Sequence, residues 1–456
     1  MGAERGLAFM SCGILSYMKN KEVASVKKPL TIMLTKSIQK ASQLAGKGGS
    51  TTPGVYARKL FPNILREVRK NVGHVIFITG TNGKTTTSNV LATILLANGK
   101  RVINNKEGAN LITGITTAFV APQNISGTKK FDYAVIEIDE GSIQRVTKEI
   151  APDYFVFTNL FKDQVDRFGT EEDLANTLRN VLEPFDCRFI LNGNDPHVSH
   201  IVTHQQAKYF GLTKDAFNFD AIANDEHVHC PKCQSTLHFD YQLYSKLGNF
   251  ACTNCDYKAQ PLEYAVTQVK PGEITINNHP YRVALEGGYN AFNVAAAVAV
   301  ASELGLTDAE IAKGLNALAL ENGRMERFSL EGTEILLNLA KNTAGLDVSL
   351  SAIDTLTGTK NVYIGVNNTE YDGTDSSWVN DADYELIKRD DVHAIYCGGT
   401  CANDVKQALL AAGFEESRVH ITTSAPLGSQ IIQGADSVLV IPNYTLLEPV
   451  RKQLVK

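Results

Sequence analysis

The sequence predicts an α/β protein with two mostly parallel sheets, because strand and helix patterns alternate along most of its 456 residues. The clearest unit covers residues 74–89, where an apolar, β-branched run leads into a glycine loop and then a helical pattern. Hydrophobic residues make up 43% of the chain, which is ordinary for a protein with sizeable cores. We expect three parts, at residues 1–50, 51–325 and 326–456, of which the second is a central P-loop domain and the third a Rossmann-like domain.

The first part is an N-terminal extension followed by a basic segment. Residues 7–18 are moderately apolar but lack a strongly charged start and a cleavage site, so we expect a non-signal extension. Residues 20–72 carry many Lys and Arg and show a loose helical pattern between Ile32 and Leu44. This positive charge is either a solvated face or a contact with anionic lipid headgroups. The net charge of −5 argues against bulk nucleic-acid binding, so no nucleic-acid partner is expected.

The glycine loop predicts a phosphate site between a strand and a helix. Its residues are Gly80, Thr81, Asn82, Gly83, Lys84, Thr85 and Thr86. The glycines let backbone N–H groups turn toward phosphate oxygens, Lys84 supplies a positive charge, and Thr85 offers a hydroxyl to Mg²⁺. We expect Lys84 to be a solvated loop residue. The loop is shorter than the full G-x-x-x-x-G-K-[ST] pattern, and a glycine turn beside a surface lysine is the alternative interpretation.

Further strands of the central domain are expected at residues 101–104, 132–138, 154–158 and 188–191. Ligands of such sheets bind beyond the carboxyl ends of the strands. Glu137 and Asp163 lie at or just after two of these ends, so either carboxylate is a candidate Mg²⁺ ligand near Thr85. The alternative for each is a capping or surface acid.

Two cysteine pairs predict an inserted zinc ribbon at about residues 226–260. Cys230 and Cys233 form one C-x₂-C pair, Cys252 and Cys255 form the other, and 18 residues separate the pairs. This spacing is typical of a four-thiolate zinc site. Four thiolates leave no open coordination position, so the metal would be structural and would supply folding energy to a segment too small for its own core.

The remaining chain predicts a helix and a second α/β unit. Asn290 and Asn293 fall on one face of the first helical turn, where their amides are either caps or readers of a purine edge. Residues 321–326 look like a domain hinge. The strands expected beyond it are residues 334–338, 361–366, 394–397, 419–422 and 437–441. A long polar loop at 367–383 is a candidate functional segment, whereas Cys397 and Cys401 are expected to serve packing.

These motifs resemble the Mur ligase family, which joins amino acids to cell-wall or folate precursors. The matching residues are 80–86, Glu137, 158–166, Asn290, Asn293 and 323–326. The cysteine ribbon, residues 105–110, and the C-terminal segments 372–378 and 441–445 narrow the resemblance to the MurT family of ligase-like subunits. Two departures from ordinary Mur ligases, at 163–166 and 338–343, make an ordinary amino-acid acceptor site doubtful. Thr343 stands where MurT-like chains usually have Pro.

The resemblance implies a function for the chain and roles for several residues. The implied reaction is ATP-dependent amidation of the α-carboxylate of D-Glu in lipid II to D-isoglutamine, through an acyl phosphate, at the cytoplasmic face of the membrane. Ammonia would come from a glutaminase partner, GatD. Arg324 would contact phosphate or ribose, Asn293 with Asn290 would contact adenine, and Asp375 would complete the Cys-His pair of the partner. The alternatives are an autonomous Mur- or folate-type amino-acid ligase and a nucleotide-gated scaffold without enzymatic activity.

Overall fold

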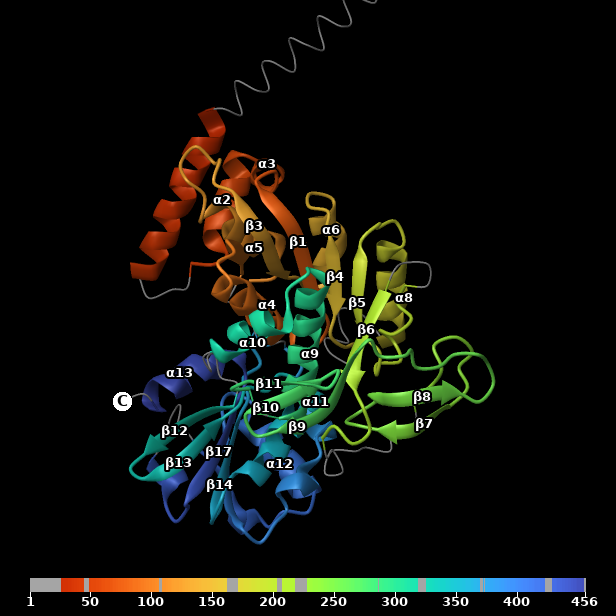
Figure 1. Ribbon diagram of the computed structural model, residues 1–456. Helices are drawn as coiled ribbons and strands as arrows, with labels where there is room; N and C mark the ends of the chain where they lie inside the picture. Colours follow the sequence, from red (N-terminus) through yellow and green to blue (C-terminus); the bar gives the residue numbers. More distant parts are fainter. Residues whose placement is uncertain are drawn as a thin grey trace, which may run out of the picture.

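A computed structural model describes most of the chain and shows a central domain, a small ribbon and a C-terminal domain (Figure 1). The described residues are 26–44, 49–105, 109–161, 171–202, 207–217, 228–285, 287–318, 325–369, 372, 374–422 and 429–454. Three predicted features therefore lie wholly or largely outside the described residues, namely the extension at 7–18, Asp163 and the hinge at 321–326 with Arg324. Among the helices that are described, none is both long and apolar enough to cross a membrane.

A nine-stranded sheet forms the central domain, in the order β11-β10-β9-β6-β5-β4-β1-β3-β2. The strands that the sequence predicted are β1 (Val72–Thr79), β2 (Val102–Asn104), β3 (Phe131–Glu137), β4 (Tyr154–Phe157) and β5 (Arg188–Asn192). They are parallel, as expected, and β1 lies between β3 and β4. The strands that sequence reasoning missed are β6 (Ala207–Leu212), β9 (Tyr264–Lys270), β10 (Glu273–Ile276) and β11 (His279–Arg282).

Helices cover both faces of this sheet because its central strands are apolar on both sides. Alternate residues of β1, such as Ile76 and Phe77, enter two different hydrophobic clusters. One face is covered by α4 (Lys84–Ala97), α9 (Gly288–Glu303) and α10 (Asp308–Asn316). The other carries α2 (Thr52–Leu60), α3 (Ile64–Arg69), α5 (Ile112–Val120), α6 (Ile143–Thr147) and α8 (Glu171–Leu182).

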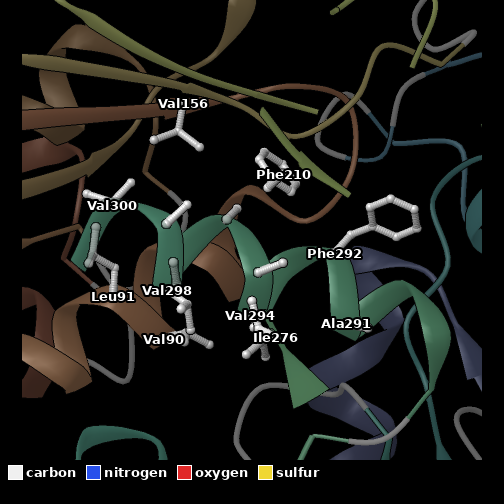
Figure 2. Close-up of a cluster of buried hydrophobic side chains, with 14 of the residues drawn as sticks. Val90, Leu91, Val156, Phe210, Ile276, Ala291, Phe292, Val294, Val298 and Val300 are labelled. Atoms are coloured by element: carbon white, nitrogen blue, oxygen red, sulfur yellow. The ribbon is translucent and has the colours of Figure 1, made fainter. Parts of the chain in front are cut away.

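The small residues of α9 allow close helix packing beneath the phosphate loop. Figure 2 shows Val294 and Val298 of α9 gathered with Val90 and Leu91 of α4. On α10, a Cβ added to Gly314 would lie 2.3 Å from the Cα of Ile94, so this helix also approaches α4 closely. The packing fixes the start of α9 relative to the start of α4, and both starts carry predicted site residues.

The ribbon is a hairpin inserted between β6 and β9. Its strands, β7 (Leu237–Gln242) and β8 (Gly248–Cys252), pair antiparallel and project from the side of the central domain (Figure 1). A small apolar cluster at its base includes Leu237, Phe250 and Tyr257.

A six-stranded sheet forms the C-terminal domain, in the order β12-β13-β17-β14-β15-β16. The five predicted strands are β13 (Thr333–Leu337), β14 (Lys360–Gly365), β15 (Val392–Gly398), β16 (Val419–Ile421) and β17 (Ser437–Pro442), all parallel, whereas the antiparallel β12 (Glu326–Leu330) was not predicted. Its α-helices are α11 (Thr343–Ser351), α12 (Ala402–Ala411) and α13 (Tyr444–Leu454). Cys397 and Cys401 are buried in the core, which confirms their packing role.

Candidate nucleotide-binding site

The phosphate loop leaves the carboxyl end of β1 and enters α4 at Lys84. Gly80 and Gly83 have φ angles of +123° and +85°, which favour glycine. A Cβ on Gly80 would lie 2.3 Å from the Thr158 hydroxyl oxygen, and one on Gly83 would lie 2.0 Å from Oδ1 of Asn293. Glycine is therefore required at both positions, because φ is positive and because neighbouring atoms leave no room for a Cβ.

Hydrogen bonds from the end of β4 hold the loop in shape. The N–H groups of Thr81 and Asn82 donate to the carbonyl and side-chain oxygens of Asn159, each at 2.8 Å. The Thr158 hydroxyl donates to the Asn82 carbonyl at 2.6 Å. The predicted segment after β4 therefore supports the loop through its backbone and amide groups.

Lys84 is buried rather than solvated, so that expectation was wrong. Its ammonium donates to Oε1 of Glu140 at 3.0 Å and to the carbonyl oxygen of Gly80. The two side chains are only 8% and 9% exposed. Burial lowers the pKa of Lys84, but the carboxylates of Glu140 and Glu137 outweigh it and raise that pKa above its usual value.

Glu140 also accepts the N–H of Gly80 at 3.0 Å, through the same oxygen that contacts Lys84. Backbone N–H groups and a lysine are the donors with which such loops bind phosphate. The Glu140 carboxylate is therefore an internal anion in contact with the donors of the phosphate loop. Sequence reasoning missed this role, although Glu140 closely follows the predicted strand end at Glu137.

Thr85 and Glu137 meet as the sequence predicted. The Thr85 hydroxyl donates to Oε2 of Glu137 at 2.7 Å, and the Asn110 amide donates to Oε1 at 3.2 Å. Asn105 anchors the backbone of Glu137 through two hydrogen bonds of 2.8 and 2.9 Å. A hydroxyl beside a carboxylate offers oxygen ligands of the kind that Mg²⁺ prefers, so Thr85 and Glu137 fit the ion.

A cleft runs from the phosphate loop to the C-terminal domain. The residues lining it are Asn82, Gly83, Thr86, Tyr244, Tyr289, Asn293, Asn338, Leu339, Lys341, Ala344, Gly345 and Val348. Asn293 contacts Asn290 at 3.2 Å on the first turn of α9, as their spacing predicted. Across the cleft, Asn82 and Asn342 exchange side-chain hydrogen bonds of 3.1 and 3.3 Å. The central and C-terminal domains therefore both contribute walls.

The four ribbon cysteines converge as predicted, with their Sγ atoms all within 4.8 Å of one another. Backbone N–H groups of Lys232 and Asn254 donate to Cys230 and Cys252, each at 3.4 Å. Hydrogen bonds from Ser235 lower the pKa of the Cys233 thiol to about 6, whereas burial raises the pKa of the Cys230 thiol to about 12. Converging thiols that receive N–H bonds fit a tetrahedral zinc ion.

The tip of the ribbon reaches the cleft, which sequence reasoning did not anticipate. Tyr244, between β7 and β8, is buried, and its ring centroid lies 5.9 Å from that of Phe161 and 6.0 Å from that of Phe292. The nearby Lys246 ammonium lies 3.0 Å from Nδ1 of His197. Burial, assisted by the charge of Lys246, lowers the pKa of His197 to about 2, which keeps this imidazole neutral.

Asp375 lies apart from this cleft, in the loop between β14 and β15. It is exposed, and its Oδ1 accepts the N–H of Ser377 at 2.8 Å. Asp372 anchors the same loop by accepting bonds from Thr445 at the start of α13, at 2.6 and 2.9 Å. The structure thus presents Asp375 toward solvent, three residues after Asp372, which is anchored to α13.

Two family models match the chain. The model for the Mur ligase middle domain matches residues 78–301, and that for the MurT ligase C-terminal domain matches residues 339–447. Subunit MurT of lipid II isoglutaminyl synthase (glutamine-hydrolyzing) from Staphylococcus aureus (strain COL) is 38% identical over 427 residues, covering 93% of this chain and 97% of that protein. The subunit of the same name from Streptococcus pneumoniae (strain R6) is 31% identical and covers 89% of this chain and 92% of that protein.

Solved structures of peptide ligases share the fold. The pseudomurein peptide ligase type C of Methanothermus fervidus superposes with a TM-score of 0.65 at 21% identity, covering 84% of this chain and 79% of that one. MurF of Thermotoga maritima, solved in complex with ADP, has a TM-score of 0.59 at 18% identity and covers 87% and 83% of the two chains. These likenesses confirm the predicted Mur-ligase-type fold.

Proposed function

The chain belongs to the MurT family, and from that premise we propose that it is the ligase subunit of a lipid II isoglutaminyl synthase. The proposed reaction is amidation of the D-Glu α-carboxylate in the lipid II stem peptide, with ATP as the energy source. The observation that carries this proposal is the phosphate loop beside the Thr85–Glu137 pair, in a chain related over 93% of its length to a protein of that name.

Activation of the carboxylate is the step that needs this loop. Ammonia does not displace oxide from a carboxylate, so a carboxylate oxygen first takes the γ-phosphoryl group of ATP, leaving ADP. Ammonia then attacks the acyl carbon, phosphate leaves with the former carboxylate oxygen, and a proton is lost to give the amide. The protein contributes placement and charge neutralisation.

We assign the nucleotide to the cleft that starts at the phosphate loop. Lys84 and the loop N–H groups would hold phosphates, while Thr85 and Glu137 would hold Mg²⁺, which neutralises charge on the phosphoryl group. Asn293, with Asn290, would read the adenine, and Arg324 would contact phosphate or ribose. Phosphates must compete with Glu140 for Lys84 and the Gly80 N–H, so Glu140 would leave them when nucleotide binds.

Ammonia is proposed to come from a GatD-type glutaminase bound to the C-terminal domain. Asp375 is exposed near the anchored Asp372, and its carboxylate would accept a hydrogen bond from the catalytic histidine of that partner. The ribbon would hold structural zinc. The synthase would work at the cytoplasmic face of the membrane, where the stem peptide of its lipid-linked substrate is accessible.

The test is mass spectrometry of lipid II incubated with ATP and this chain. Glutamine with the glutaminase partner, or ammonia without it, should convert the D-Glu carboxylate to an amide. An addition of an amino acid instead of ammonia would identify an autonomous ligase. No ATP-dependent product under any of these conditions would overturn the proposal.

A further inference from the structure

The helix at residues 26–44 has a buried inner face that docks it on the central domain. Ile32 is fully buried in the cluster that contains Ala57 of α2 and Ile64 of α3. Thr31 and Thr35 are also buried, and their hydroxyls donate to backbone carbonyls one turn earlier, each at 2.7 Å. Packing against the domain therefore already orients this helix, and its opposite face points outward.

The outward face carries apolar side chains in its first two turns and at its end, which is unusual for a docked helix. Val26 is 71% exposed, Leu30 52%, Met33 50% and Leu44 81%. Spacings of four and three residues place the first three on one side of the helix, and we call these four residues the apolar stripe. Single exposed apolar side chains need no explanation, but an aligned series marks an interaction surface. The helix, drawn in red, lies at the outer edge of the molecule (Figure 1).

Positive charge is concentrated along this helix and in a loop that packs against it. Between residues 26 and 44 the sequence has four lysines, Lys27, Lys28, Lys36 and Lys40, and no acidic residue, although the whole chain has a net charge of −5. The loop that contacts Lys28 through Gly127 adds exposed lysines at 129 and 130 and Ile125, which is 56% exposed. Glu67 is the acidic side chain that acts on Lys28, and it pairs with Lys70 at 2.6 Å.

We propose that the apolar stripe and its lysines lie in the interface of a membrane that contains anionic lipid. Helices that lie flat in a bilayer interface combine an apolar face with flanking lysines. A nucleic acid would be attracted by the lysines but would gain nothing from the stripe, whereas a lipid surface satisfies both. Membrane binding through the apolar stripe and its lysines does not depend on the proposed reaction. It would explain how the chain reaches a lipid-anchored substrate.

Vesicle flotation of the full chain tests the inference without measuring catalysis. The vesicles are phosphatidylcholine alone, or phosphatidylcholine mixed with phosphatidylglycerol. The chain should float with the mixed vesicles, and added salt should weaken binding. Leu30→Glu with Met33→Glu should abolish flotation, whereas Leu96→Glu, at an equally exposed leucine of α4, should leave it unchanged. Lys36→Ala and Lys40→Ala should each weaken binding about fivefold, because each lysine near an anionic surface contributes about 1 kcal/mol.

Three outcomes would overturn the inference. The chain could fail to float with either vesicle, or the Leu30→Glu, Met33→Glu variant could float like the Leu96→Glu control, which would place any lipid contact elsewhere. Light scattering could also show that the parent chain is a dimer and the double variant a monomer, while neither protein binds vesicles. A melting curve matching that of the parent chain shows that the double variant is folded.

Discussion

Removing the charge of Lys84 should destabilise the protein as well as block nucleotide binding. The ammonium and the Glu140 carboxylate are 3.0 Å apart, with side chains only 8% and 9% exposed. Lys84→Met leaves Glu140 charged, buried and without its lysine. Loss of one partner of a buried ion pair costs about 3–5 kcal/mol. We therefore expect Lys84→Met to lower the free energy of unfolding of the central domain by that amount.

A second substitution separates the structural from the functional effect. In Lys84→Met with Glu140→Gln both charges are gone, and the glutamine oxygen can still accept the N–H of Gly80. Replacing a buried ion pair by uncharged groups of similar volume is often neutral, so the double variant should recover most of the lost stability. It should still fail to bind ADP, because the lysine proposed to hold the phosphates is missing.

Lys360→Met provides a control at a second buried lysine. Lys360 is 4% exposed and pairs at 2.6 Å with Asp391, which is 35% exposed and also binds Arg389, in the C-terminal domain, away from the phosphate loop. It should lose stability but keep ADP binding. The measurements are urea unfolding, followed by one probe in each domain, and calorimetric titration with ADP and Mg²⁺. A Lys84→Met variant with the unfolding midpoint of the parent chain, or a double variant no more stable than the single one, would refute this reasoning.

Three further predictions concern the metal, the loop and the partner. Cys252→Ser should lose zinc, because three thiolates leave an open and weaker site, and metal analysis of a purified parent chain without zinc would contradict this. Gly83→Ala should abolish ADP binding in titration calorimetry, because the residue has φ of +85° and a Cβ would lie 2.0 Å from Oδ1 of Asn293; unchanged affinity would be inconsistent with the loop geometry. Asp375→Asn should lower glutamine-driven amidation by on the order of 10⁴-fold and spare ammonia-driven amidation, and an equal fall in both rates would exclude the proposed triad role.

Much of the fold could be predicted because strong local signals agree with the tertiary structure. The central strands have continuous apolar runs, which a sheet covered on both faces requires, and β1 and β3 were found on this basis. The missed strands lie toward the edges. β10 and β11 are only four residues each and include Pro280, so their pattern is weak.

The candidate site was predicted where both partners lie at the carboxyl ends of adjacent parallel strands, here β1 and β3. The pairing of Thr85 with Glu137 follows from the rule that ligands gather at the carboxyl ends of parallel strands. The burial of Lys84 was not predicted, because its partner Glu140 lies beyond the end of the same strand, β3, in a short 3-10 helix whose position the strand pattern does not fix. Sequence spacing also does not reveal that the hairpin holding Tyr244 folds back to the cleft.

The position of the ribbon tip means that the ribbon cannot be removed without damage to the central domain. Leu243 and Leu247 are 1% and 0% exposed, and they belong to the same hydrophobic cluster as α4 and α9. Burial of each leucine stabilises the folded state by roughly 1.5–3 kcal/mol. Excision of the hairpin would remove this stabilisation and would also open the cleft wall at Tyr244. A chain shortened by the hairpin would therefore be a damaged central domain and not a simpler one. The insert is part of the host domain, and removing it would require compensating changes in the surrounding core.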